Sequence, residues 1–329
     1  MKAKWWFAGE TAPEGYRQLL PTTKAGSEDR WFRDAQKMTI AVEGIFVAQK
    51  KDNLSGNDLI VSTKHQRGDR PQVDRVHFYR QNVKSPNHEG PFFHPVVFAT
   101  QDFREQDTLF TIGMRIYDED GFNAQEAREI EAAIVGGAAS SAVAFPAFAP
   151  YAGLAAGVGT ALVKLVDTLD DHDCILDATI ALNVNKPADQ GYDLLQPGFL
   201  VCFESDIDVS QLRLGDDRRV YRIVNDDAVP YETVSYAVLR VRRDFLPTPD
   251  YAIDEKVATL LAQLDSGKGQ PGAASLRFLR ETLDAYTNYT RLQRYTELAA
   301  KTTLTDDEKA LLAELKGDQK LTPYLPTGR

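Results

Sequence analysis

The feature that most constrains the fold is a series of short segments between residues 38 and 243 in which apolar and polar side chains alternate. Alternation with a period of two, in segments rich in β-branched and aromatic residues, is typical of β-strands. Clusters of turn-forming residues such as DNLSGND and NHEGP separate the segments. Eight segments fit this description: MTIAVEGIFVA, DLIVSTKH, RVHFYRQ, HPVVFAT, LFTIGMRIYD, CILDATIALNV, GFLVCFES and YAVLRVRR. Because no helices alternate with them, they predict an antiparallel eight-stranded β-sandwich rather than a Rossmann-type parallel sheet.

One apolar segment interrupts this pattern. Residues 132–163 carry no charged side chain and consist mostly of Ala, Gly, Val and Phe. The preceding NAQEAREIEAAIV predicts the start of a helix, and Pro146 and Pro150 break the segment in the middle. We therefore expect two helices, at about 123–144 and 151–169, that form an inserted helical hairpin. Gly153 and Gly157 have the G-x-x-x-G spacing that lets two helices approach closely.

The regions before and after the strands differ in character. Residues 1–37 are mixed and are interpreted as an N-terminal extension, whose aromatic residues anchor it on a neighbouring core: Trp5, Trp6, Phe7, Trp31 and Phe32. After FLPTPD the period becomes helical, which predicts a helical C-terminal domain over residues 246–329. Thr305 and Glu308 have the spacing of a capping box for its last helix, and Gly317 suits the C-cap.

Charge and cysteine content exclude several classes of protein. The formal net charge is −10, which argues against a basic face that binds nucleic acid non-specifically. Cys174 and Cys202 are the only cysteines, too few for a disulfide framework or a cysteine-rich zinc site. The first residues contain no apolar core of signal-peptide length, so a cytoplasmic, reducing location is expected.

Carboxylates gather where three of the predicted strands begin or end. The stretch RIYDEDG ends one strand in acidic residues. Asp58 is the first residue of DLIVSTKH, with Asp52 six residues before it, and Asp171 and Asp173 precede CILDATIAL. Ca²⁺ takes about six to eight oxygen ligands, which carboxylates on loops supply well, whereas Mg²⁺ prefers a tighter octahedral shell. The candidate metal ligands are Asp52, Asp58, Asp118, Asp120, Asp171 and Asp173. The alternative is that these aspartates are turn residues that bind no metal.

These acidic strand ends, in this order along residues 38–245, resemble those of C2 domains. MTIAVEGIFVAQKKDNLSGNDLIVSTKH resembles the opening strands and first calcium loop, and RIYDEDG resembles the Asp-x-Asp strand end. HDCILDATIAL resembles the segment after the third loop, where Asp173, with Asp171 as a substitute, takes the place of the family's last aspartate. The resemblance implies a calcium-binding sandwich whose loops face a membrane. The chain departs from the family because about fifty residues, including the apolar hairpin, separate Asp120 from Asp171.

The inserted hairpin has two interpretations. A membrane-spanning helix needs about 20 apolar residues, and each uncharged arm has only about thirteen or fourteen. Shallow insertion of the tip, led by Phe145, Phe148 and Tyr151, is therefore one hypothesis. The other is that the hairpin packs against the sheet or a second subunit, because so large an apolar surface is unfavourable in water.

Catalytic motifs are weak by comparison. The spacing of His88, Glu89 and His94 does not match the helix-borne H-E-x-x-H zinc site, and no G-x-S-x-G elbow, P-loop or G-x-G-x-x-G is present. No sequence feature links Cys202 to His94 as a nucleophile pair. Among enzyme hypotheses, a hydrolase that uses paired carboxylates of the acidic loops fits best.

Taken together, these features predict a non-enzymatic protein that captures Ca²⁺ with its acidic loops. The bound cation would allow docking onto an anionic membrane surface or a protein partner, with the hairpin as an apolar anchor. The expected location is the cytoplasm, with peripheral association with a membrane when calcium is bound. The alternative is a structural protein that binds no metal and forms a homo-oligomer through the 123–169 hairpin.

Overall fold

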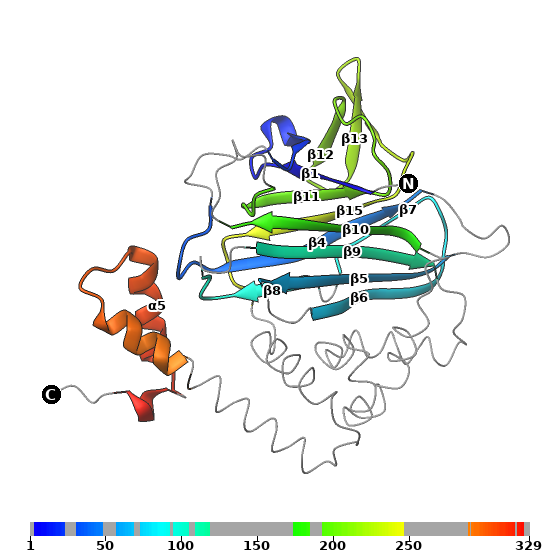
Figure 1. The fold of residues 1–329 in the computed structure, drawn as a ribbon. Helices are drawn as coiled ribbons and strands as arrows, with labels where there is room; N and C mark the ends of the chain where they lie inside the picture. The colour runs from blue at the N-terminus through cyan, green and yellow to red at the C-terminus, as the bar shows by residue number, and fades with distance from the viewer. Residues whose placement is uncertain are drawn as a thin grey trace, which may run out of the picture.

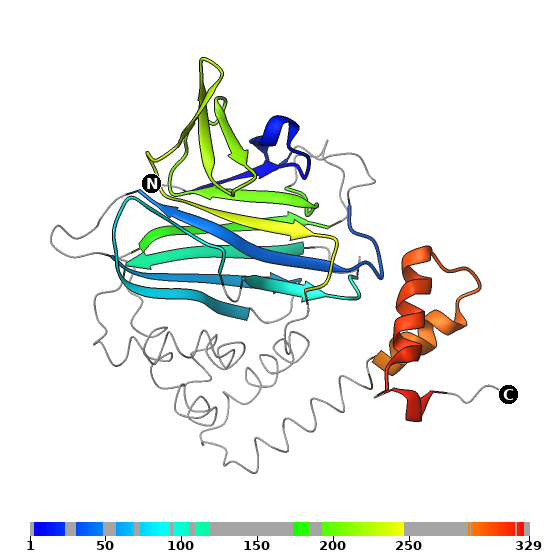
Figure 2. The same ribbon diagram turned by 180° about the vertical axis from the view of Figure 1, so that it is seen from behind.

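The protein consists mainly of antiparallel β-sheets, with helices near its C-terminus (Figures 1 and 2). A computed structural model describes residues 3–23, 31–48, 57–68, 73–92, 95–104, 109–118, 174–184, 193–246, 289, 291–319 and 321–325. Within these residues, fifteen strands form three sheets. The paired strands in all three sheets run antiparallel, as the sequence predicts.

The largest sheet has seven strands in the order β3-β1-β11-β15-β4-β7, and β8 also pairs with β4. Its strands are β1 (Lys4–Ala8), β3 (Leu20–Pro21), β4 (Met38–Val47), β7 (Asn87–Glu89), β8 (Val96–Thr100), β11 (Gly198–Phe203) and β15 (Tyr236–Arg242). A short 3₁₀ turn, η1 (Pro13–Gly15), follows β1. The first strand of the chain thus lies inside the main sheet, next to β11.

The two other sheets have four strands each. One has the order β10-β9-β5-β6 and contains β5 (Asn57–Arg67), β6 (Val73–Val83), β9 (Leu109–Asp118) and β10 (Cys174–Asn183). The other is smaller and has the order β14-β13-β12-β2. It contains β2 (Tyr16–Gln18), β12 (Leu212–Gly215), β13 (Val220–Val224) and β14 (Asp227–Pro230).

All eight strands predicted from the alternation are present, as β4, β5, β6, β8, β9, β10, β11 and β15. The expected total of eight strands is wrong, because the alternation does not predict the remaining seven. All seven are only two to five residues long, too short to display a period. The predicted boundary at residue 37 stays a prediction, although β1, before it, belongs to the same sheet as β4.

The seven-stranded sheet is buried on both faces, and β11 shows this most clearly. Leu200 and Cys202 join the core shared with the four-stranded sheet of β5, β6, β9 and β10. Phe199, Val201 and Phe203 point to the opposite face and join a second core with strands β12 and β13. Every residue of β11 is buried, as expected for a strand covered on both sides. The aromatic residues predicted as anchors behave similarly, since Trp5, Phe7 and Phe32 belong to the first core.

A β-bulge in β4 keeps its apolar residues on the correct face. In the pairing with β15, Gly44 lies opposite Val238 and Val42 lies opposite Leu239, so Glu43 has no partner. This extra residue shifts the alternation by one position. As a result, residues on both sides of the bulge point into the same core: Met38, Ile40, Val42, Ile45 and Val47.

The C-terminal helices pack against the segment that leads into β4 through a small separate core. They comprise a helix at residues 291–300, α5 (Asp306–Gly317) and the 3₁₀ turn η7 (Thr322–Tyr324). Leu298, Leu311, Leu315 and Leu321 pack together with Ala35, which precedes β4. The Arg294 side chain, only 6% exposed, pairs with Asp102 at 3.1 Å and joins these helices to the end of β8.

The predicted capping box of α5 is confirmed. The Thr305 hydroxyl accepts a hydrogen bond from the Glu308 backbone N–H, and the Glu308 carboxylate accepts one from the Thr305 N–H. Gly317 is the last residue of α5, but the C-cap is Asp318, not Gly317. The chain leaves the helix through the extended backbone of Asp318 and does not use a left-handed glycine.

The predicted hairpin at 123–169 and the first part of the predicted C-terminal domain lie outside the described residues. Within the described part of the chain, no helix has the length and apolar character needed to cross a bilayer.

Candidate functional site

Two of the predicted metal ligands, Asp58 and Asp118, meet at one end of the four-stranded sheet. Strands β5 and β9 pair with Leu59 opposite Asp118, so Asp58 lies directly beside the end of β9. The Asp58 backbone N–H donates to Asp118 Oδ1 at 2.7 Å. Sixty residues separate the two aspartates in the sequence, and the register of β5 on β9 brings them into direct contact.

Both carboxylates are buried and accept backbone hydrogen bonds. Asp118 is 3% exposed and Asp58 is 9% exposed. Asp58 Oδ1 accepts a hydrogen bond from the Asn82 backbone N–H at 2.8 Å. Asn82 is in the left-handed region at φ 56°, a conformation that asparagine tolerates better than most residues. Asn82 was not among the predicted site residues, and its only signal was an asparagine directly after the predicted strand RVHFYRQ.

The strands that flank the other predicted ligands begin or end at the same edge. Strand β5 begins at Asn57, β9 ends at Asp118, and β10 begins at Cys174, opposite Tyr117 of β9. The loops that carry the predicted acidic groups therefore join the sheet at one end. The remaining ligands, Asp52, Asp120, Asp171 and Asp173, lie outside the described residues, as do the predicted contact residues Phe145, Phe148 and Tyr151.

The chemistry of the Asp58–Asp118 pair is compatible with a cation, although the pair alone is too small a site. Two carboxylates supply at most four oxygen atoms. Ca²⁺ requires about six to eight oxygen ligands, so additional residues must contribute. Within the described ranges, no group of three or more His, Cys, Asp or Glu side chains is placed to hold a metal ion.

A second Asp-x-Asp sequence, Asp206 and Asp208, is a structural turn. Asp206 forms an ion pair with Lys4 at 3.0 Å. Asp208 accepts hydrogen bonds from the backbone N–H and the hydroxyl of Ser210, and these bonds lower the pKa of the Asp208 carboxyl. The Asp-x-Asp pattern at Asp206 and Asp208 thus lies in an exposed turn, whereas Asp118, in the other copy of the pattern, is buried at the end of a strand.

The histidines and cysteines in the described part of the chain do not form a nucleophilic centre. His77 lies on β6, as predicted, and its Nε2 is 2.6 Å from the hydroxyl of Thr63. Burial raises the pKa of the Cys202 thiol well above its usual value, which disfavours the reactive thiolate. His94, the other member of the imagined pair, lies outside the described residues.

His88 lines a cavity of about 230 Å³ between β7 and the smallest sheet. Burial, followed by the charge of Arg219, lowers the pKa of His88. The imidazole is therefore neutral at neutral pH. The His88 ring packs against Gly44 of β4. A Cβ atom added to Gly44 would stand only 3.2 Å from His88 Nε2, so this close approach depends on the glycine.

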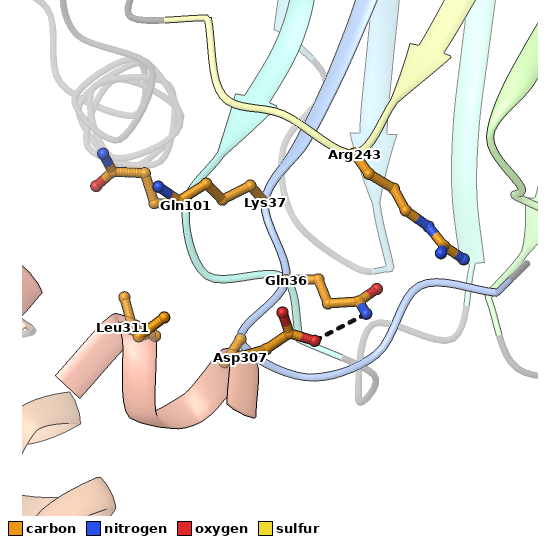
Figure 3. Close-up of a pocket in the computed structure, with 8 residues that line it drawn as sticks. Gln36, Lys37, Gln101, Arg243, Asp307 and Leu311 are labelled. Carbon is orange, nitrogen blue, oxygen red and sulfur yellow. Dashed lines mark hydrogen bonds between the residues drawn. The ribbon is translucent and has the colours of Figure 1, made fainter. Parts of the chain in front are cut away.

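A larger cleft of about 330 Å³ lies between α5 and the segment that leads into β4 (Figure 3). Gln36 Nε2 donates to Asp307 Oδ2 across it at 3.0 Å, and Lys37, Arg243 and Leu311 also line it. Its lining contains no histidine, cysteine or serine and only one carboxylate. The cleft is thus part of the junction between the largest sheet and the C-terminal helices.

Comparison with known proteins gives no family for this chain. No protein-family model matches it, and no curated protein is similar to it at a significant level. The C2 resemblance therefore depends on the acidic strand ends described above.

Proposed function

We propose that this protein is a non-catalytic docking protein that binds Ca²⁺ at the acidic end of a C2-like β-sandwich. The observation that carries this proposal is the contact between Asp58 and Asp118 at the end of β5 and β9. The contact runs from the Asp58 backbone N–H to the Asp118 carboxylate, so two buried acidic residues that are far apart in sequence are held at the same strand end. Buried carboxylates are unfavourable unless donors or a cation compensate them.

The two hydrogen bonds from backbone N–H groups orient these carboxylates. They hold Asp58 and Asp118 in place before a cation arrives, which reduces the entropy lost on binding. In the proposed site, Asp52 and Asp120 extend the ligand set from the loops after β4 and β9. Asp173, with Asp171 as a substitute, extends it from the segment before β10.

The proposed C2-like arrangement is a two-sheet sandwich with the hairpin of residues 123–169 inserted in the third loop. It is supported by the shared core between the seven-stranded and four-stranded sheets. It is also supported by the arrangement of strand ends, because β9 ends and β10 begins at the same edge. An insertion between these neighbouring strands can leave both ends of the loop close to Asp118.

Calcium would change how the protein meets an anionic surface. The chain has a formal net charge of −10, so acidic loops repel anionic lipid headgroups. A bound divalent cation neutralises the loop end and bridges to headgroup oxygens. The hairpin tip, with Phe145, Phe148 and Tyr151, would then supply the apolar anchor.

The test is co-sedimentation of the full chain with phosphatidylserine-containing vesicles, in calcium and in EGTA. We expect pelleting in calcium only, and we expect Asp118→Asn/Asp120→Asn to abolish it. The second Asp-x-Asp sequence offers a matched control, because Asp206→Asn/Asp208→Asn removes the same charge at a structural turn. The control variant should pellet like the unmodified protein.

The other outcomes are equally informative. Equal pelleting in both buffers would reject the calcium switch and retain the hairpin as an anchor. No pelleting, together with a stable oligomer in EGTA on size exclusion, would favour the assembly hypothesis in which the hairpin joins subunits.

A further inference from the structure

Three arginine side chains converge on one buried aromatic ring at the junction of the largest and smallest sheets. The guanidinium carbons of Arg17, Arg218 and Arg240 lie 4.8, 4.9 and 5.3 Å from the centroid of the Phe199 ring. All three are within the range of a cation–π contact. Since all three guanidinium carbons lie within 5.3 Å of the same ring centroid, the three positive charges are close to one another.

The three arginines come from separate elements. Arg17 belongs to β2, Arg218 to the turn between β12 and β13, and Arg240 to β15, directly opposite Phe199 of β11. Arg218 is in the left-handed region at φ 68°, an unusual conformation for a residue other than glycine. The fold therefore assembles this group of charges from three parts of the chain.

Two of the arginines have carboxylate partners. Arg17 is 8% exposed, pairs with Asp216 at 2.8 Å and donates two hydrogen bonds to the Glu10 carbonyl at 3.2 Å. Arg218 pairs through Nε with Glu43, the bulge residue of β4, at 3.1 Å, and also donates to the Asp216 carbonyl. These contacts fix the positions of the guanidinium groups of Arg17 and Arg218.

Arg240 differs from the other two. Within the described residues its guanidinium group has neither a hydrogen bond nor an ion pair, and its side chain is only partly buried. Burial, together with the neighbouring charges of Arg242 and Arg218, lowers its pKa, while Glu43 opposes this effect. Arginine nevertheless remains charged at neutral pH, so Arg240 presents five N–H donors that the described residues do not use.

Covering Phe199 does not by itself explain a third arginine. Arg17 and Arg218 already stack over the ring, and an apolar or neutral side chain at position 240 would cover it without repelling them. With the Asp216 and Glu43 carboxylates, the three arginines keep one formal positive charge, and it is Arg240 that lacks a carboxylate partner among the described residues. A phosphate group beside Arg240 would meet this charge and receive donors in the fork geometry that suits it. We propose that Arg17, Arg218 and Arg240 form a binding site for a phosphate group, with Arg240 as the direct contact.

This site is separate from the acidic end of the sandwich, and its test excludes calcium. The full chain, in EGTA, is titrated calorimetrically with inorganic phosphate and with pyrophosphate. We expect binding that Arg240→Gln weakens by about tenfold or more, the effect of losing a charge-assisted hydrogen bond. The matched control is Arg222→Gln, because Arg222 also stacks on an aromatic ring, that of Tyr231 at 5.2 Å, but does not contact Phe199.

Thermal unfolding without phosphate separates binding from packing. If Arg240 serves a ligand, Arg240→Gln leaves the unfolding temperature without phosphate unchanged or raises it, and phosphate stabilises the unmodified protein and Arg222→Gln more than Arg240→Gln. The proposal is overturned if the unmodified protein binds neither anion, or if both variants bind equally well. It is also overturned if Arg240→Gln lowers the unfolding temperature while phosphate binding is unchanged.

A vesicle experiment in EGTA identifies the source of the phosphate group. Pelleting with phosphatidic acid vesicles that Arg240→Gln abolishes would assign a lipid headgroup. Binding of the free anions without pelleting would assign a soluble phosphate ester. Since calcium is absent throughout, failure of this site would leave the calcium proposal standing, and the reverse also holds.

Discussion

Replacing Asp118 by alanine and by asparagine isolates the hydrogen bond that joins the two candidate ligands. Both changes remove the same negative charge, so any relief of repulsion from Asp58 is common to them. Asparagine keeps an oxygen that can accept the Asp58 N–H, whereas alanine leaves this N–H without its 2.7 Å partner. A buried donor left without an acceptor costs about 1–3 kcal/mol. We therefore expect Asp118→Ala to be less stable than Asp118→Asn by about that amount.

The assay is urea-induced unfolding in EGTA, followed by the fluorescence of tryptophans that include the buried Trp5 of β1. The difference between the two variants is the measured quantity, which makes the comparison insensitive to the charge change. If their free energies of unfolding agree to within about 0.5 kcal/mol, the typical effect of an innocuous surface change, the hydrogen bond does not stabilise the fold.

The same two variants test the metal site when the experiment is repeated in calcium. A ligand that binds only the folded state stabilises it by about 2.7 kcal/mol at one hundred times its dissociation constant. The unmodified protein should gain stability of this order at a saturating calcium concentration, and both variants should gain much less. Equal gains for all three proteins would refute a role for the Asp118 carboxylate in binding.

Three further changes test other parts of the fold. Gly198→Ala should lower the free energy of unfolding by about 1–3 kcal/mol or more, because φ is +144° and a Cβ would stand 2.6 Å from the Ala8 carbonyl oxygen; urea unfolding measures this. Thr305→Ala removes the cap of α5 and should cost about 1 kcal/mol, seen as faster amide hydrogen exchange in residues 306–317. His88 has a lowered pKa, so the unfolded chain binds a proton more readily than the folded protein. The stability that comes from the neutral His88 imidazole should be fully present above the usual histidine pKa of 6.5 and should be lost as the pH falls through the lowered pKa. In urea unfolding, His88→Gln should remove this part of the pH dependence.

Each of these predictions has a contradicting result. Unchanged stability of Gly198→Ala would mean that the chain relaxes around the new methyl group. Unchanged exchange in Thr305→Ala would show that packing on Ala35, and not the cap, holds α5. Identical pH profiles for His88→Gln and the unmodified protein would show that burial of His88 does not bear on stability.

The strands were predictable wherever a segment was long enough to show its period. The alternation in LFTIGMRIYD predicts β9 and its end at Asp118, because apolar side chains on every second residue can be buried only on one face of a strand. The capping box of α5 was predictable for a similar local reason, since Thr305 and Glu308 satisfy each other's backbone groups.

The smallest sheet and β1 were not predictable in this way. RLGDD matches the composition of a turn, yet its first three residues end β12, which is held between β13 and β2. In β1, the segment KWWFA is buried against two cores and therefore shows no alternation. Strands β1 and β2 pair with β11 and β12, which are about two hundred residues away in the sequence, and no local pattern encodes these pairings.

The sequence by itself determined which segments become long strands, that they pair antiparallel, and that acidic residues stand at the end of β9 and before β5. These properties follow from side-chain periodicity and turn chemistry, which act over a few residues. Only the tertiary structure decided that Asp58 contacts Asp118 and that Arg17, Arg218 and Arg240 share the ring of Phe199. The reason is that strand register and sheet packing, set by the burial of two cores at once, place residues from distant parts of the chain together.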